Sequence, residues 1–252
     1  MSDLQKTLSE IDELQNALSV LRPLPSEVVG KIRQAFDIEY TYESNRIEGN
    51  TLTLQETALV INEGMTIAGK SMREHLEAIN HAEAVEFIKE MANGDIEISE
   101  RMIKDIHALV LRGIDRQNAG IYRNVPVMIS GSRYIPPQPY LIVPQMEMFI
   151  EEYKKLESKG EHAVVIAAFL HDELVKIHPF IDGNGRTSRL LMNLYLLSKG
   201  YIIANIKGNY EDRIQYYTAL EKSHIENEPI DFYKLMAEVE KEALQKYLNI
   251  LQ

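Results

Sequence analysis

Apolar residues recur at a helical period along most of the chain. In residues 3–21, leucine or isoleucine returns every three or four positions, as on the apolar face of an amphipathic helix. Pro23 and Pro25 follow and predict the end of this helix. The same spacing predicts further helices at residues 26–48, 53–64, 71–92, 99–113, 145–158, 161–177, 187–199, 210–223 and 230–250. The pattern therefore predicts a mainly α fold.

Residues 114–144 break this pattern and contain five of the nine prolines. Two short apolar runs, at 127–130 and 133–135, flank Gly131-Ser132, a pair typical of a type II′ hairpin turn. We therefore expect a small β-hairpin here. Its exposed strand edges would offer backbone groups to an extended segment of another protein.

The composition narrows the class of protein. With 252 residues, 45% of them hydrophobic, the chain can bury a sizeable core as one domain with extensions. It has no cysteine, which excludes disulfides and thiolate metal sites. A net charge of −11 disfavours broad nucleic-acid binding. No signal peptide or membrane span is predicted, so we expect a cytoplasmic protein without a membrane partner.

The candidate chemistry is concentrated in HPFIDGNGRTSR, residues 178–189. His178 can exchange a proton near neutral pH and so can act as a base. Asp182 offers the hard oxygen ligand that Mg²⁺ prefers beside a polyphosphate. Gly183, Asn184 and Gly185 allow successive backbone amides to converge on one anion. Together they predict a phosphate-binding nest.

The predicted helix at 187–199 places this nest at a helix N-terminus, where free amides and the helix dipole favour an anion. Arg186 and Arg189 are three residues apart, so both can reach outer phosphate oxygens from one face of the first turn. The GNGRTS run lacks the last glycine of a dinucleotide-binding fingerprint and follows a helix, which argues against that alternative.

Residues 178–189 resemble the signature of the Fic family (filamentation induced by cAMP), HPFxDGNGRxxR, at every specified position. The resemblance implies a helical core and transfer of AMP from ATP to a Ser, Thr or Tyr hydroxyl of a protein. By resemblance, His178 is the general base, Phe180 anchors the loop and Asp182 holds Mg²⁺. Gly185, where a phosphate-transferring branch of the family has a larger residue, favours AMP transfer.

The same resemblance assigns the phosphate contacts. Asn184 and the amides of Gly183 and Gly185 would contact the α- and β-phosphates. Arg186 would bind the outer phosphates, and Arg189 the γ-phosphate. The target-aligning flap of Fic proteins would correspond to Met128, Ile129, Ser130 and Gly131.

A second run, SNRIEGN at residues 44–50, reads on its own as the capped end of a helix. It also resembles the inhibitory motif of Fic proteins, in which Ser44, Glu48 and Gly49 occupy the specified positions. By that resemblance, Glu48 pairs with Arg189 and forces ATP into an unproductive pose. Such a pair is plausible because an arginine–carboxylate contact is strong when partly buried.

Residues 210–224 resemble the nucleoside-binding segment of the family. Tyr216 and Tyr217 could stack on a base, although core packing explains them too. Some relatives have an amide residue where His224 stands, so the base contact is open. The expected regions are an N-terminal helical region (1–97), the catalytic core (98–235) and a C-terminal helix (236–252).

Two other functions are compatible with the same residues. One is removal of AMP from a modified protein, with Glu48 positioning a water. The other is a non-catalytic nucleotide-binding module, against which the complete signature with His178 argues. ATP and an unidentified hydroxyl-bearing protein, the chain itself included, are the expected partners, and homo-oligomer formation is left open.

Overall fold

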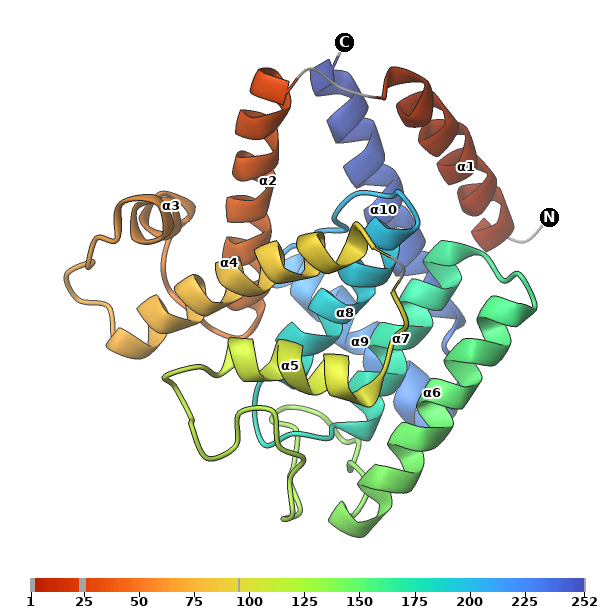
Figure 1. The fold of residues 1–252 in the computed structure, drawn as a ribbon. Helices are drawn as coiled ribbons and strands as arrows, with labels where there is room; N and C mark the ends of the chain where they lie inside the picture. The colour runs from red at the N-terminus through yellow and green to blue at the C-terminus, as the bar shows by residue number, and fades with distance from the viewer. Residues whose placement is uncertain (1–2, 23–25, 95, 252) are drawn as a thin grey trace.

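The computed structural model describes residues 3–22, 26–94 and 96–251. These residues form ten α-helices and one short 3₁₀ helix, η1 (Figure 1). The helices are α1 (Asp3–Leu21), α2 (Ser26–Ile47), α3 (Leu54–Glu63), α4 (Met72–Ala92), α5 (Glu100–Val110), η1 (Pro139–Leu141), α6 (Ile142–Ser158), α7 (Ala163–Ile177), α8 (Asn184–Ser198), α9 (Tyr210–Glu226) and α10 (Ile230–Leu251). The predicted helices are confirmed. Pro23 and Pro25 lie outside the described residues.

Helices α7 and α8 pack against each other at the centre of the fold (Figure 1). Leu170 and Leu174 of α7, and Leu190 and Leu194 of α8, are completely buried. Helices α4 and α5 cover α8, while α6 and α10 pack on α7, and α1 packs along α10. Because α8 is enclosed on most sides, as a helix that is buried all round should be, the loop between α7 and α8 has a rigid support.

The start of α8 differs from the prediction. The helix begins at Asn184 instead of residue 187, and Gly183 caps it with φ +75°. Gly183 takes this left-handed conformation at little cost because it has no Cβ. Asn184, Gly185 and Arg186 therefore form the first helical turn, where backbone amides have no partner within the helix.

The predicted β-hairpin is wrong, since no residue in the described ranges forms a strand. The chain does turn here, because the Ser132 amide donates to the Ile129 carbonyl at 3.2 Å. The central residues are Ser130 and Gly131, not Gly131 and Ser132. Gly131 has φ +78° at the second central position, as in a type II turn. That turn type splays the flanking segments and does not match strand twist, so no ladder forms.

Residues 114–138, here called the flap loop, are anchored at two places. Near its start, the Arg123 guanidinium donates to the carbonyls of Val125 (2.9 Å) and Pro137 (2.6 Å). Near its tip, Arg133 pairs with Glu221 of α9, with Nε and Oε1 3.1 Å apart. The buried Arg123 thus joins the two ends of the loop, while Met128 at its tip remains exposed.

In the described part of the chain, none of the helices combines the length and the apolarity that crossing a membrane requires.

Candidate active site

His178 lies where α7 ends, in the left-handed conformation with φ +51°. Its amide donates to the Leu174 carbonyl at 3.0 Å. Its Nδ1 lies 3.2 Å from the Val175 carbonyl, which can only accept, so Nδ1 carries the hydrogen. Nε2 is left as an acceptor without a partner among the described residues. Burial lowers the pKa of His178 to about 4, so the ring is neutral at pH 7.

The loop after His178 is held by Phe180 and Asn184. The Asn184 side chain accepts from the Phe180 amide at 3.0 Å and donates to the Phe180 carbonyl at 2.9 Å. Both ends of this amide are therefore used to fix the loop, and Asn184 is 3% exposed. In this arrangement the Asn184 side chain fixes the shape of the loop, and its contact with a phosphate stays a prediction.

His107 of α5 supports the loop, a role that the sequence did not reveal. Its ring stacks on Phe180, with centroids 3.6 Å apart and an interplanar angle of 7°. The Gly120 amide donates to its Nδ1 at 2.9 Å, so Nε2 carries the hydrogen and donates to the Asp182 carbonyl at 2.9 Å. Burial lowers the pKa of His107 to about 4, which keeps this neutral tautomer.

Arg123 also supports His178 directly, since its Nε donates to the His178 carbonyl at 2.8 Å. Its other guanidinium nitrogens hold the flap loop, so one buried side chain ties the candidate base to that loop. Neither His107 nor Arg123 stands in a motif. His107 is 75 residues from Asp182, and Arg123 is 55 residues from His178, so only tertiary packing brings these residues together.

Asp182 lies between two arginines. Its Oδ1 accepts from the Gly183 amide at 2.6 Å and lies 3.5 Å from Arg186 Nη2. Its Oδ2 pairs with Arg73 of α4. Burial acts to raise the pKa of Asp182, yet Arg186 and the Gly183 amide bring it below its ordinary value. The carboxylate is therefore ionised, and its side chain is 42% exposed.

Arg186 is 2% exposed and points back into the fold as well as towards Asp182. Its Nη1 lies 3.4 Å from Glu77 Oε1. Glu77 also binds Arg73, with Nε and Oε1 3.1 Å apart. The four side chains Arg73, Glu77, Asp182 and Arg186 form one alternating ionic network, which fixes the side of the nest nearest to α4.

Arg189 lies on the other side of the nest and is 1% exposed. Its Nε donates to Ser44 Oγ at 3.0 Å, and its Nη2 donates to the Ser44 carbonyl at 2.9 Å. Nη2 also binds Glu48 Oε1 at 2.7 Å. Burial opposes the charge on Arg189, but Glu48 outweighs it and raises the pKa of the guanidinium. The structure thus contains the Glu48–Arg189 contact that the resemblance implied.

Gly185 leaves room for this contact. A Cβ atom at Gly185 would lie 2.4 Å from Glu48 Oε1 and 3.1 Å from Arg189 Nη1. The carboxylate of Glu48 therefore rests against the backbone of the first turn of α8. Gly49 follows with φ +93°, where glycine is favoured, and ends the segment that presents Glu48. An anion already occupies part of the space beside the nest.

The two tyrosines of α9 differ in their surroundings. Tyr216 is 1% exposed, and its hydroxyl lies 3.3 Å from Arg189 Nη1 and 3.0 Å from His171 Nε2. Its ring is part of the core and cannot stack on a base here. Tyr217 is 43% exposed, and its hydroxyl donates to the Ile47 carbonyl at 3.0 Å. Of the two, only Tyr217 has an accessible face for a nucleoside.

His224 does not face solvent. Its Nε2 lies 2.9 Å from Asp172 Oδ1, and Ser223 Oγ donates to Asp172 Oδ2 at 2.6 Å. The Tyr134 ring of the flap loop lies 5.0 Å from the His224 ring. His224 is thus held by α7 and covered by the flap loop.

The flap residues predicted to contact a target lie at the tip of the flap loop. Met128 is 88% exposed, which leaves it free to contact another molecule. Ile129, Ser130 and Gly131 follow it through the type II turn. They form an exposed loop and not a strand edge.

The fold and this site define a helical protein of the Fic type, with the signature at the junction of two central helices. Residues 97–196 match the sequence profile of the Fic/DOC family. Protein adenylyltransferase Fic of Drosophila grimshawi is 34% identical over 244 residues, which cover 97% of this chain and 49% of that protein. The chain spans about half the length of the curated relatives it matches.

Solved structures agree. A fragment of Fic-1 from C. elegans is 30% identical with a TM-score of 0.84, covering 98% of this chain and 72% of that one. A Fic domain containing signaling protein from Bacteroides thetaiotaomicron is 28% identical with a TM-score of 0.88, covering 96% of each chain. The chain belongs to the Fic/DOC family.

Proposed function

We propose that this chain is a protein adenylyltransferase, which transfers AMP from ATP to a Ser, Thr or Tyr hydroxyl of a protein. One observation carries the proposal: the open Nε2 of His178 and the free amides of the first turn of α8 lie at the two ends of one short loop. A base and an anion cradle are thus held together. Curated relatives that bear this name support the assignment.

In the proposed reaction, the hydroxyl oxygen of the target attacks the α-phosphorus of ATP while His178 Nε2 takes the hydroxyl proton. A P–O bond to the target forms, and the bond between the α-phosphorus and the bridging oxygen breaks, so pyrophosphate leaves. The amides of Asn184, Gly185 and Arg186 would stabilise the charge on the phosphate oxygens. Catalysis of this kind rests mainly on positioning and charge.

The Mg²⁺ that accompanies ATP would be held by Asp182. In the described ranges, no group of three or more acidic or histidine side chains could hold a metal alone. A single ionised carboxylate beside a phosphate nest fits Mg²⁺ that is shared between protein and polyphosphate. Bound there, Mg²⁺ supplies charge neutralisation for the outer phosphates. Arg73 would have to release Asp182 first.

We further propose that Glu48 inhibits the enzyme. Its carboxylate pairs with Arg189 and lies against Gly185, so it would repel the γ-phosphate of ATP from that side of the nest. ATP bound with its outer phosphates displaced would present the α-phosphorus out of line with the attacking hydroxyl. Removal of Glu48 would free Arg189 to bind phosphate.

Removal of AMP from a modified protein is a second candidate function, and one observation favours it. Glu48 uses only Oε1 for Arg189, while Oε2 has no partner among the described residues and the side chain is 34% exposed. A water held by Oε2 could attack the phosphorus of a protein-bound AMP. The bond from that phosphorus to the target oxygen would break, a proton from the water would pass to that oxygen, and AMP would leave. The two reactions would share His178 and the nest.

The test is transfer of label from ATP to proteins of a cell lysate by the Glu48→Gly variant. Addition of the variant should increase protein labelling from ATP labelled at the α-phosphate and should not change the labelling from ATP labelled at the γ-phosphate. Label from the γ-phosphate that appears only with the added variant would indicate phosphate transfer and refute the proposal. Release of AMP from a labelled target by the wild type, but not by Glu48→Gly, would support the second candidate.

A further inference from the structure

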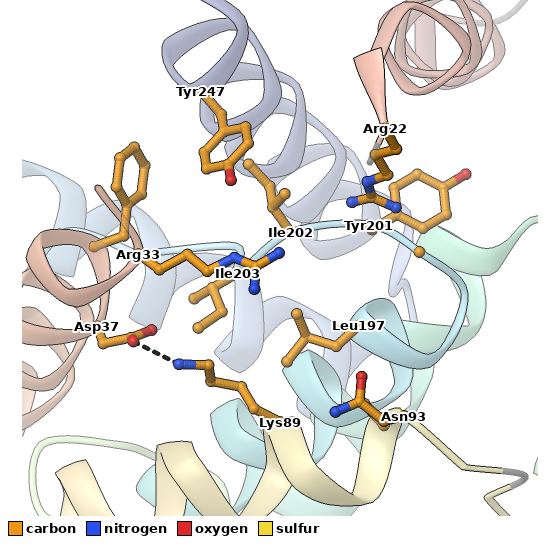
Figure 2. A pocket seen from close by; sticks show the side chains of 13 residues that line it. Arg22, Arg33, Asp37, Lys89, Asn93, Leu197, Tyr201, Ile202, Ile203 and Tyr247 are labelled. Atoms are coloured by element: carbon orange, nitrogen blue, oxygen red, sulfur yellow. Dashed lines mark hydrogen bonds and ion pairs between the residues drawn. The ribbon is translucent and has the colours of Figure 1, made fainter. Parts of the chain in front are cut away.

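A pocket of about 380 Å³ lies at the opposite end of α8 from the phosphate nest. It is lined by α2, α4, α10, the end of α8 and the chain that follows it, and by Arg22 just beyond α1 (Figure 2). Leu197 and Gly200 mark the α8 end, whereas the nest is at Gly183. The volume falls in the range typical of small-molecule sites, roughly 300–1,000 Å³. Nothing in the candidate active site uses this pocket.

Two of its cations, Arg22 and Arg33, make no close ion pair and no side-chain hydrogen bond with the side chains that the structure describes, which leave out those of residues 26–29 and 31. Asp37 attracts Arg33 only from beyond ion-pair distance. Lys89, the third cation, is already neutralised by Asp37 at 2.7 Å and Glu86 at 2.8 Å. Figure 2 shows the Arg33 guanidinium and the Tyr247 hydroxyl directed into the middle of the pocket, with Arg22 reaching the same space from the α1 side.

An excess of positive charge around one pocket is unusual for a chain whose net charge is −11. Acidic side chains are abundant, yet the only carboxylate that lines the pocket in the described ranges is Asp37, and it is engaged by Lys89. Two unpaired guanidinium groups that face one space repel each other weakly and gain from an anion between them. Arginine also binds planar anions through two parallel hydrogen bonds.

Most of the other residues that line the pocket are apolar or aromatic, with Asn93 as a polar exception. Leu197 lies at its base, with Ile202 and Ile203 each at most 9% exposed. The Phe36 and Tyr247 rings form the wall on the α2 and α10 side, with centroids 5.6 Å apart and a near-perpendicular, edge-to-face geometry. Aromatic rings prefer this geometry, so a further ring could stack beside them. The cationic rim and the apolar base together favour a ligand that has an anionic group at one end and an apolar ring at the other.

We propose that this pocket binds a small organic anion, in which an aromatic ring carries a phosphate, sulfonate or carboxylate group. The ring would pack against Leu197, Ile202 and Tyr247. The anionic group would bridge Arg22 and Arg33. The site is separate from the ATP site, so the proposal does not depend on the proposed activity.

Phenyl phosphate is a suitable probe, and amide NMR signals of the whole chain report where it binds. Titration should shift the signals of Gly200, Tyr201, Ile202 and Ile203. Replacing both arginines, in Arg22→Gln/Arg33→Gln, should weaken this binding by at least about tenfold, because both charge-assisted contacts are lost. Both side chains are exposed, so the variant should fold, and its spectrum verifies this.

The matched control is Arg101→Gln/Lys154→Gln, which removes the same charge from exposed ion pairs on α5 and α6. It should bind phenyl phosphate as the wild type does. Inorganic phosphate and phenol should each bind the pocket more weakly than phenyl phosphate. Three results would each overturn the proposal. The shifts could be confined to Gly183–Gly185, inorganic phosphate or phenol could bind as tightly as phenyl phosphate, or Arg22→Gln/Arg33→Gln could bind with unchanged affinity.

Discussion

Glu48 Oε1 lies 2.7 Å from Arg189 Nη2, although the two residues are 141 positions apart in the sequence. The contact joins the end of α2 to the first turns of α8 and places a carboxylate beside the phosphate nest. Ser44 completes it by binding the same guanidinium through its hydroxyl and its carbonyl. The proposed inhibition by Glu48 rests on this relationship.

Loss of the His178 imidazole should slow transfer severely. We expect His178→Ala to reduce the rate of target labelling by about 10²–10⁴-fold, the usual contribution of a general base. ATP affinity should hardly change, because the nest and both arginines remain. Labelling rates and ATP binding measured on the same preparation test this. Undiminished labelling would remove His178 from the mechanism.

Gly185→Ala should have opposite effects on stability in two backgrounds. In the wild type, the new Cβ would lie 2.4 Å from Glu48 Oε1, so the carboxylate must move and the melting temperature should fall. With Glu48→Gly already present, that clash is gone. Alanine then favours the helix by about 1 kcal/mol, offset in part by Arg189 Nη1 at 3.1 Å. Thermal unfolding of the wild type, Gly185→Ala, Glu48→Gly and the double variant gives the coupling energy between the two positions. Additive effects would mean that the Glu48 carboxylate does not lie against Gly185.

The helices of this fold could be predicted from the sequence because their apolar faces repeat over three or more turns. The loop at 127–135 could not be predicted, because the type of its turn depends on the position of Gly131 within it. As the first central residue, glycine favours a type II′ hairpin turn. As the second, which it is here, it favours a type II turn, which does not lead into paired strands. The sequence pattern predicts a late start for α8 because Asn184 and Gly185 are poor helix formers. In the structure, Asn184 is held by its side-chain hydrogen bonds to the Phe180 backbone.

Within the site, the signature residues could be predicted because they are contiguous. Their supports could not, because His107 and Arg123 become neighbours of the loop only when α5 and the flap loop pack on it. Tyr216 illustrates the reverse case. The tyrosine pair suggested a stacking platform, but the first ring is buried against His171 and only Tyr217 is accessible.

The flap tip should matter for the protein target and not for the nucleotide. We expect Met128→Asp to reduce target labelling about tenfold or more, since an exposed apolar contact becomes a charge that must be desolvated. ATP affinity should stay the same. Met148→Asp on α6 is the control, because Met148 is also exposed, at 66%, and lies outside the flap loop. Equal losses in both variants would deny the flap a role.

Glu240 of α10 makes stability depend on pH. It is completely buried, and burial raises its pKa well above 4.5. Folded Glu240 therefore keeps its proton above pH 4.5, while the unfolded chain loses it, so this residue destabilises the fold progressively as pH rises. Glu240→Gln removes the effect. Its stability advantage over the wild type should grow as the pH rises above 4.5, by at most about one tenfold change in the unfolding equilibrium per pH unit, until the folded protein also loses this proton.

Urea unfolding of the wild type and Glu240→Gln across this range measures the difference directly. Comparing the two proteins at each pH cancels the contribution of the buried histidines. Their lowered pKa values act in the opposite direction, since they favour the folded state as pH rises from about 4 to 6.5. A difference that does not change with pH would show that Glu240 ionises in the folded protein.

Inhibition by Glu48 through Arg189 is tested by the rate of target labelling from α-labelled ATP, measured for the wild type, Glu48→Gly, Arg189→Ala and the double variant. Glu48→Gly should be about tenfold or more faster than the wild type, because Arg189 is released to hold the γ-phosphate. Adding Arg189→Ala should erase most of that gain, a coupling expected of residues in contact. If Glu48→Gly labels no target faster than the wild type, Glu48 is not an inhibitor and the proposed role of its contact with Arg189 is contradicted.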